Sequence, residues 1–229
     1  MEAPPQEKRV ISDTALRDSF LVCQVLFFGL TLVTVIEALR TPSAMARGMM
    51  NMESAVSLIA GYVYAVFGKM AENPETTYAD ITRLRYYDWF CTTPLLLLTL
   101  VMFFAYQTGK PVVFSRYMIL FVCNFLMLSA GYAGETGAID RNVGGAIGFV
   151  FFGLLVLALM QGFVLGTEID MLEKVILSVF ITVWAAYGAV YYIEDLGLRN
   201  RIMNVLDVIA KIFIGIMLWA HVSGIMDWK

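Results

Sequence analysis

Long apolar runs alternate with short polar segments along the whole chain. The runs cover residues 15–39, 48–70, 84–107, 113–133, 142–166, 172–193 and 200–226. Each is long enough to cross a bilayer, because a transmembrane helix needs ~20 apolar residues. Lipid offers no hydrogen-bond partners to backbone groups, so each run is predicted to be a helix. We therefore expect an all-α membrane protein, a bundle of seven transmembrane helices that forms a single domain over residues 1–229.

Composition supports this class and excludes others. Hydrophobic residues make up 59% of the chain and charged residues 15%, with a mean hydropathy of +0.73. Soluble domains carry about 25% charged residues, so the expected surroundings are a lipid bilayer. The net charge of −3, with no basic cluster, argues against nucleic acid as a partner. The only histidine is His221, and the three cysteines, Cys23, Cys91 and Cys123, lie in apolar runs. We expect no metal site or disulfide framework, and buried cysteines.

A lysine lies inside the last apolar run. Lys211 is about 11 residues from the start of this run, where a charge costs ~2.5–3.5 kcal/mol to insert. Buried amines lose protons readily and can form Schiff bases with aldehydes. Asp207 lies one turn earlier on the same helix face, and Asn204 and Asn200 extend this face toward the start of the helix.

The third run carries a second polar stripe. Its members recur at helical spacing and therefore share a face: Arg85, Asp88, Thr92 and Thr99. One interpretation is that Asp88 pairs with Arg85, and Asp207 with Lys211, so that the charges merely neutralise one another. The other is that both carboxylates face Lys211 and together balance a protonated Schiff base.

Aromatic residues surround these stripes in the sequence. Trp89 follows Asp88, and Trp184, Tyr187 and Tyr191 lie on one face of the sixth run. Such a stripe is compatible with ordinary core packing. Beside a buried lysine it could instead enclose a flat apolar polyene, and the pattern alone leaves both interpretations open.

Two segments resemble a known family. Arg85-Tyr-Tyr-Asp-Trp-Phe-Cys-Thr-Thr-Pro-Leu-Leu-Leu-Leu is similar to the third helix of the microbial (type-1) rhodopsins. Leu206-Asp-Val-Ile-Ala-Lys211 is similar to their retinal-attachment segment. The likeness extends over all seven runs, and the set of motifs looks most similar to the channel-like rhodopsins of large algal viruses.

The resemblance implies a photoreceptor rather than an enzyme. All-trans retinal would be covalently attached to Lys211 as a protonated Schiff base, with Asp88 and Asp207 as counterions. Arg85 would gate the extracellular half. The other positions that match the retinal pocket are Tyr86, Trp89, Thr92, Thr93, Met127, Gly131, Trp184 and Tyr187. The family also implies an extracellular N-terminus and a cytoplasmic C-terminus, which the loop charges do not determine.

The sequence departs from the family's proton pumps at three positions. Thr99 stands where they carry a proton-donating carboxylate, 11 residues beyond Asp88, or about 16 Å along a helix. Asn124 stands where pumps, and also many algal channels, have an aspartate facing the position of Thr93. Gly188 replaces the usual proline of the sixth helix.

Three functions remain open at this point. A light-gated channel for monovalent cations would use an acidic and amide trail formed by Glu37, Asn51, Glu53, Asn200 and Asn204. Glu37 and Glu53 could instead reach lipid headgroups, since each lies close to the end of a run. An outward proton pump would use Asp88 as acceptor and Glu194 or Asp195 for release, with slow return past Thr99. A sensory receptor would need a separate membrane partner. Assembly as a homo-oligomer is compatible with each function.

Overall fold

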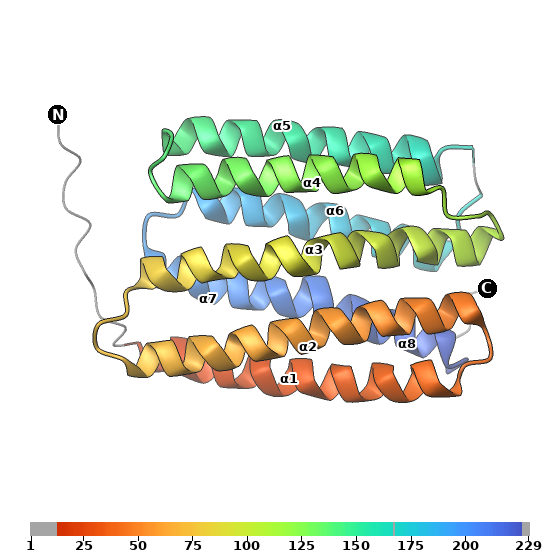
Figure 1. The fold of residues 1–229 in the computed structure, drawn as a ribbon, viewed down its shortest axis with the longest axis horizontal. Coiled ribbons are helices and arrows are strands. Elements are labelled where there is room, and N and C mark those ends of the chain that lie inside the picture. Colours follow the sequence, from red (N-terminus) through yellow and green to blue (C-terminus); the bar gives the residue numbers. More distant parts are fainter. Residues whose placement is uncertain (1–12, 167, 226–229) are drawn as a thin grey trace.

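The computed structural model describes residues 13–166 and 168–225, and it forms one bundle of parallel and antiparallel helices (Figure 1). Seven helices in this part of the chain are long and apolar enough to cross a membrane, as predicted. The elements in chain order are α1 (Thr14–Arg40), α2 (Ala44–Glu72), α3 (Tyr78–Thr108), α4 (Phe114–Glu135), α5 (Arg141–Leu159), η1 (Met160–Val164), α6 (Met171–Tyr191), α7 (Leu196–Asp207), η2 (Val208–Phe213) and α8 (Ile214–Val222). The fifth crossing combines α5 with η1, and the seventh combines α7, η2 and α8.

Helix boundaries differ from the apolar runs where a cap extends the helix. The helix α2 begins four residues before the predicted residue 48, because the Ser43 hydroxyl accepts a hydrogen bond from the Ala46 N–H. The helix α3 begins six residues before residue 84, at a capping box formed by Thr77 and Asp80. The seventh crossing ends at Val222, and the predicted end at residue 226 lies outside the described residues.

Two π-helical turns interrupt the α-helical geometry, and the hydrophobic pattern predicted neither. One is η1, at the end of the fifth crossing, and the other is η2, which contains Lys211. A π turn inserts an extra residue into the helix and often marks a functional site. The bulge in η2 therefore changes the direction of side chains at the predicted attachment lysine.

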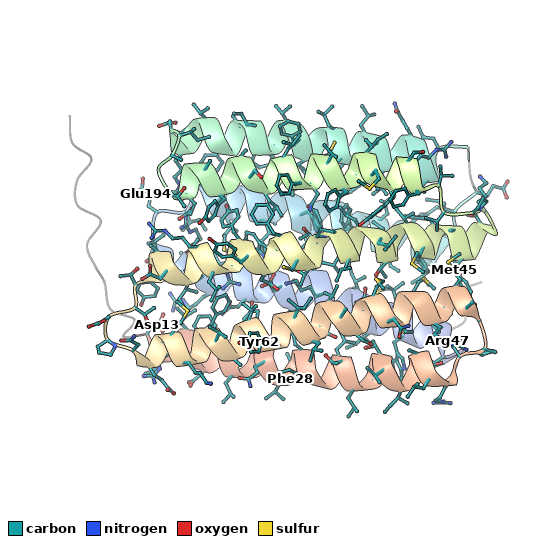
Figure 2. All side chains as sticks on the ribbon, viewed as in Figure 1. Asp13, Phe28, Met45, Arg47, Tyr62 and Glu194 are labelled. Atoms are coloured by element: carbon teal, nitrogen blue, oxygen red, sulfur yellow. The ribbon has the colours of Figure 1, made fainter. Side chains whose placement is uncertain are left out.

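We call the end of the bundle where α1, α3, α5 and α7 begin the N-terminal end, at the left of Figure 1, and the opposite end the C-terminal end. Apolar side chains face outward along the bundle, as Phe28 and Tyr62 do (Figure 2). This surface suits lipid, and the protein is a multi-pass membrane protein.

The interior is divided along its length. A cluster of buried apolar side chains fills the C-terminal half, and it includes Met49, Met50, Leu97, Leu100, Phe103, Phe104 and Leu218. Most of the buried charged and amide side chains lie in the other half, around Arg85 and Asp207, although Glu37, Glu53 and Glu173 are buried in the C-terminal half. The expectation of three buried cysteines was wrong for Cys91. This residue is exposed, because its helix face points to the lipid side. Cys23 is buried and Cys123 is partly buried.

Candidate functional site

Lys211 lies between two carboxylates in the middle of the bundle. Its Nζ donates a hydrogen bond to Asp88 Oδ2 at 2.6 Å and lies 3.7 Å from Asp207 Oδ1. All three side chains are buried, with at most 2% of each residue exposed. The structure therefore brings together the lysine and the two carboxylates from α3, α7 and η2 that the sequence singled out.

The local ion pairing is not the simple neutralisation considered above. Arg85 Nη1 binds Asp207 Oδ2 at 3.0 Å, and the closer carboxylate to Lys211 is that of Asp88. The interpretation in which Asp88 pairs with Arg85 was therefore wrong. Both groups lie on α3. Arg85 points toward Asp207 on α7 and Asp88 points toward Lys211, so each ion pair joins α3 to the seventh crossing.

The two carboxylates have very different surroundings. Asp207 accepts hydrogen bonds from Tyr187 Oη at 2.5 Å, Tyr64 Oη at 2.7 Å and Arg85 Nη1 at 3.0 Å, with Trp89 Nε1 at 3.4 Å. Asp88 has only the bond from Lys211, and its Oδ1 has no hydrogen-bond partner among the described residues. Donors stabilise an ionised carboxylate, so the surroundings favour the anion more strongly at Asp207 than at Asp88.

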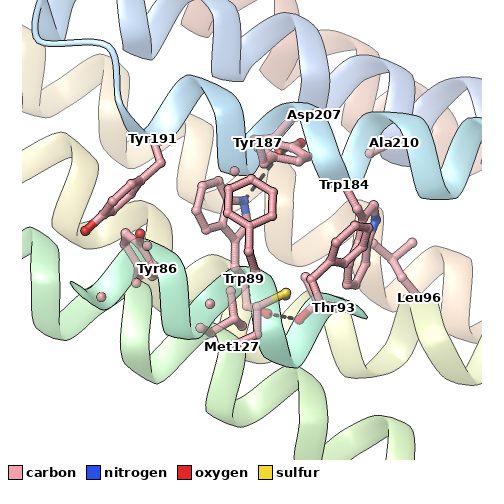
Figure 3. A pocket seen from close by; sticks show the side chains of 18 of the residues that line it. Tyr86, Trp89, Thr93, Leu96, Met127, Trp184, Tyr187, Tyr191, Asp207 and Ala210 are labelled. Carbon is pink, nitrogen blue, oxygen red and sulfur yellow. Dashed lines mark hydrogen bonds between the residues drawn. The ribbon is translucent and has the colours of Figure 1, made fainter. Parts of the chain in front are cut away.

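An apolar cavity of about 110 Å³ extends from Lys211 between α3, α4, α5 and α6. The rings of Trp89 and Tyr187 line it and pack edge to face with centroids 5.2 Å apart, and Trp184 also lines it (Figure 3). The lining contains the predicted positions Tyr86, Trp89, Thr93, Met127, Gly131, Trp184 and Tyr187. The predicted Thr92 is not among the lining residues, and its hydroxyl donates to the Asp88 carbonyl oxygen instead.

This cavity fits an elongated apolar aldehyde that ends at Lys211. Its lining is almost entirely aromatic, aliphatic or glycine, with the charged groups gathered at the lysine end. A Cβ at Gly131 would lie 2.9 Å from Tyr86 Oη, and one at Gly188 would lie 2.5 Å from Cζ of Phe149. The missing side chains therefore keep the cavity open. Phe149, Phe152 and the glycines of α5 at 144, 145 and 148 were not found from the sequence.

Asn124 and Thr93 tie α4 to α3 beside the cavity. The Asn124 Nδ2 donates to Thr93 Oγ1 at 2.8 Å, and Thr93 donates in turn to the Trp89 carbonyl oxygen at 2.6 Å. The predicted juxtaposition of positions 93 and 124 is confirmed. An amide at position 124 supplies a hydrogen bond but no ionisable group, so this pair can position Trp89 without exchanging a proton.

A polar network continues from Asp207 toward the N-terminal end. Arg85 Nη2 donates to Asn204 Oδ1 at 2.7 Å and lies 3.4 Å from Asn200 Oδ1. Asn204 Nδ2 donates to Ser19 Oγ at 2.7 Å, which brings in α1. The stripe predicted on the seventh helix therefore faces the interior and meets Arg85.

The remaining predicted pathway residues do not gather at one place. Glu37 and Glu53 are 4% and 1% exposed, so the interpretation that they reach headgroups was wrong. Asn51 is exposed, because two residues along a helix it points about opposite to Glu53. The prediction that Asn51 faces an internal path was therefore wrong. Glu194 is exposed in the loop at the N-terminal end (Figure 2).

The sequence reasoning also missed groups that complete the site. Tyr64 on α2 bonds both Asp207 and Arg85, but a single tyrosine in an apolar run carries no distinguishing pattern. Nearer the N-terminal end, the fully buried Arg199 forms an ion pair with Glu135 and donates to the Tyr191 carbonyl oxygen. Both charges lie near the ends of predicted helices, where they resemble ordinary loop residues.

These observations define a class: a seven-helix membrane protein with a buried lysine that faces two carboxylates at the end of an apolar cavity. Residues 15–225 match the family model described as bacteriorhodopsin-like protein, and the chain belongs to this family of microbial rhodopsins. Its members are membrane proteins with a retinal chromophore and are not enzymes, so membership implies retinal for this chain.

Individual relatives support the same placement. The crystal structure of viral rhodopsin OLPVRII superposes with a TM-score of 0.86 at 35% identity, covering 93% of this chain and 100% of that one. Acetabularia Rhodopsin I shares the fold, with a TM-score of 0.77 at 21% identity over 93% of this chain and 96% of that one. A blue-light absorbing proteorhodopsin from Gamma-proteobacterium Hot 75m4 is 26% identical over 60% of each chain. The match thus spans 60% of the length of this curated relative.

Proposed function

We propose that this chain, as a single domain, is a light-activated ion-transporting rhodopsin with retinal bound to Lys211. The observation that carries the proposal is the position of Lys211 Nζ, between Asp88 and Asp207 at the end of the apolar cavity. Retinal on this lysine supplies light-driven isomerisation next to an ionisable nitrogen. Trp89, Tyr187 and Trp184 would hold its polyene, and Met127 and Gly131 would shape the cavity.

The two carboxylates divide the work at the nitrogen. Asp207 is fixed as an anion by two tyrosine hydroxyls and Arg85, so it balances positive charge at Lys211 without taking a proton. Asp88 Oδ2 is at hydrogen-bond distance from Nζ and can accept the proton when the geometry at the nitrogen changes. Loss of the Lys211–Asp88 ion pair would alter the electrostatic field on Arg85 and the network beyond it.

Light-gated cation conduction is the transport mode we favour. The support is the polar network of Arg85, Asn204 and Asn200, in which the two asparagine amide oxygens can replace part of the hydration of a monovalent cation. The apolar cluster of the C-terminal half closes this path in the present conformation. Conduction therefore needs movement in that half, past Glu53 and Thr99. We further propose that the N-terminal end is extracellular and the C-terminal end cytoplasmic.

Outward proton pumping is the second candidate. The supporting observation is the direct 2.6 Å bond between Lys211 and Asp88, combined with a C-terminal half that is closed by apolar side chains. A pump needs such a barrier to keep the proton from returning by the path it left. Exposed Glu194 would release the proton at the N-terminal end. The ion pair between buried Arg199 and partly buried Glu135 joins α7 to α4 at the same end.

Retinal attachment is tested by removing the lysine. The Lys211→Ala variant should yield no visible absorption band after addition of all-trans retinal. The matched control is Lys69→Ala, because Lys69 is exposed near the end of α2. A coloured Lys211→Ala protein that responds to light would overturn the proposal.

Voltage-clamped photocurrents separate the two transport modes. A channel current reverses direction at a voltage that follows the cation gradient, whereas a pump current stays outward over the accessible voltages. Changing external sodium and potassium at constant pH should therefore shift the reversal voltage. A current that never reverses would favour the pump and contradict the channel.

A further inference from the structure

Two tyrosine hydroxyls belong to the lining of the cavity that begins at Lys211. They are those of Tyr86 on α3 and Tyr191 on α6, which we call the tyrosine pair. Figure 3 shows both at one end of the pocket and Trp184 at the other. The two residues are buried, with 4% of Tyr86 and 6% of Tyr191 exposed. The pair lies nearer the N-terminal end of the bundle than Lys211, because Tyr191 is the last residue of α6.

Both hydroxyls approach the same face of α4. A Cβ added at Gly131 would lie 2.9 Å from Tyr86 Oη, and one added at Gly134 would collide with Tyr191 Oη. Positions three residues apart share a helix face and are about 4.5 Å apart along the axis. The pair therefore presents its two oxygens to one small region beside α4.

The two hydroxyls differ in the hydrogen bonds that they already make. Tyr191 Oη donates to the Arg141 carbonyl oxygen at 3.1 Å, so only its lone pairs are available. The ring of Tyr86 packs edge to face against Trp89 and Tyr132, but none of the described residues accepts a hydrogen bond from its Oη. A buried hydroxyl without a partner is unfavourable, because it has lost its bonds to water. The pair thus has one free donor and one free acceptor.

Glycines of α5 leave space beside the tyrosine pair. Gly144, Gly145 and Gly148 all line the cavity. A Cβ at Gly144 would lie 2.7 Å from the Ala130 carbonyl oxygen, and one at Gly145 would collide with Tyr192 Oη. This stretch of α5 therefore has no side chains at the three positions that meet the cavity. A ligand can carry an additional group here without displacing a side chain of α5.

We propose that the tyrosine pair binds a hydroxyl group on the ring of the chromophore, so that this protein prefers a ring-hydroxylated retinal to retinal itself. The ring is the end of the molecule remote from the aldehyde that reacts with Lys211. A hydroxyl group fits the pair because it can accept a bond from Tyr86 Oη and donate one to Tyr191 Oη. A keto group would satisfy Tyr86 alone. This inference rests on the proposed attachment of retinal to Lys211.

Competition between aldehydes tests the preference. The retinal-free protein receives equal amounts of all-trans retinal and a hydroxylated form, 3-hydroxyretinal or 4-hydroxyretinal. The bound chromophores are then released with hydroxylamine and quantified by chromatography. At least one hydroxylated form should be taken up in about tenfold excess, because a buried donor gains its partner. Equal uptake of retinal and both hydroxylated forms would overturn the proposal, and water would then be the partner of Tyr86.

Substitutions that remove one oxygen test each member of the pair. Tyr86→Phe removes the free donor and should abolish the preference for the hydroxylated aldehyde. Tyr191→Phe removes the acceptor, so it should reduce this preference but leave uptake of 4-ketoretinal relative to retinal unchanged. The control is Tyr132→Phe, because the Tyr132 ring packs against Tyr86 while its hydroxyl bonds that of Tyr87. A preference that persists in Tyr86→Phe would contradict the assignment.

A ring compound without the aldehyde tests the pair independently of attachment. In Lys211→Ala, 3-hydroxy-β-ionone should raise the unfolding temperature more than β-ionone does at the same concentration, because binding to the folded protein stabilises it. The additional substitution Tyr86→Phe should remove this difference. Equal shifts with the two compounds in Lys211→Ala would contradict the subsite. Failure of the proposed function is a separate result, in which Lys211→Ala keeps its colour with retinal.

Discussion

Asp88 Oδ2 lies 2.6 Å from Lys211 Nζ, whereas Asp88 Oδ1 has no hydrogen-bond partner among the described residues. The other carboxylate near the lysine, Asp207, is bound by Tyr187, Tyr64 and Arg85. One carboxylate is thus held as an anion by several donors, and the other depends on the lysine alone. This asymmetry supports the separate roles proposed for two chemically similar groups.

Replacing Asp88 with Asn should shift the visible absorption band to longer wavelengths. The carboxylate beside Lys211 Nζ stabilises positive charge at the nitrogen in the ground state, and its removal lowers the excitation energy. Absorption spectra of the retinal-bound protein measure the shift. Asp88→Glu retains the charge and should stay close to the original band. An unshifted band in Asp88→Asn would show that Asp88 is not ionised beside the nitrogen.

Replacing Asp207 with Ala should destabilise the folded protein by about 3–5 kcal/mol, because it leaves a buried guanidinium without its charge partner. Arg85 is 0% exposed, and its only ion pair in the described part of the chain is with Asp207. Unfolding of the retinal-free protein, followed by circular dichroism, measures the loss.

The partly exposed pair of Arg201 and Asp13 provides the control for this measurement. Arg201→Gln should cost less than about 1 kcal/mol, because exposed ion pairs contribute little. Similar losses in the two variants would mean that Arg85 finds other stabilisation, for example from the rings of Tyr64 and Phe67, which lie 5.6 and 5.0 Å from its Cζ.

Replacing Tyr64 with Phe should cost about 1.5–3 kcal/mol, as expected for a lost hydrogen bond to a charged group. Its hydroxyl donates to Asp207 Oδ2 and accepts from Arg85 Nη1, so it links both members of the ion pair. Tyr62→Phe is the control on the same helix, because Tyr62 is 66% exposed. If the two substitutions have equal effects on unfolding, the buried bond contributes nothing measurable.

Much of the fold and the centre of the site could be predicted from the sequence. Transmembrane helices follow from the length of apolar runs, and Lys211, Asp88 and Asp207 stand out because charges are rare inside such runs. The pairing of Arg85 with Asp207 could not be predicted, since it depends on how α3 and α7 are rotated about their axes.

Other features were missed for different physical reasons. Tyr64 functions through a hydroxyl that the hydrophobic pattern does not distinguish from a core ring. The π turn at Lys211 leaves no sequence signal of its own, although it changes where the lysine points. Asn51 was assigned to the interior because of its polarity, but its helix face points outward. Polarity alone therefore does not determine whether an amide faces the interior of the bundle.

Replacing Gly188 with Ala should change the shape of the retinal cavity without unfolding the protein. The added Cβ would lie 2.5 Å from Cζ of Phe149, which lines the cavity from α5. Phe149 is 40% exposed, so its ring has room to turn outward. We expect slower uptake of retinal and a shifted absorption band, measured by titrating the retinal-free protein.

Phe149→Ala combined with Gly188→Ala should restore uptake, because it removes the contact. Gly153→Ala on α5 is the control, since its Cβ would meet nothing within 4 Å. Wild-type uptake and colour in Gly188→Ala would place retinal away from this side of the cavity.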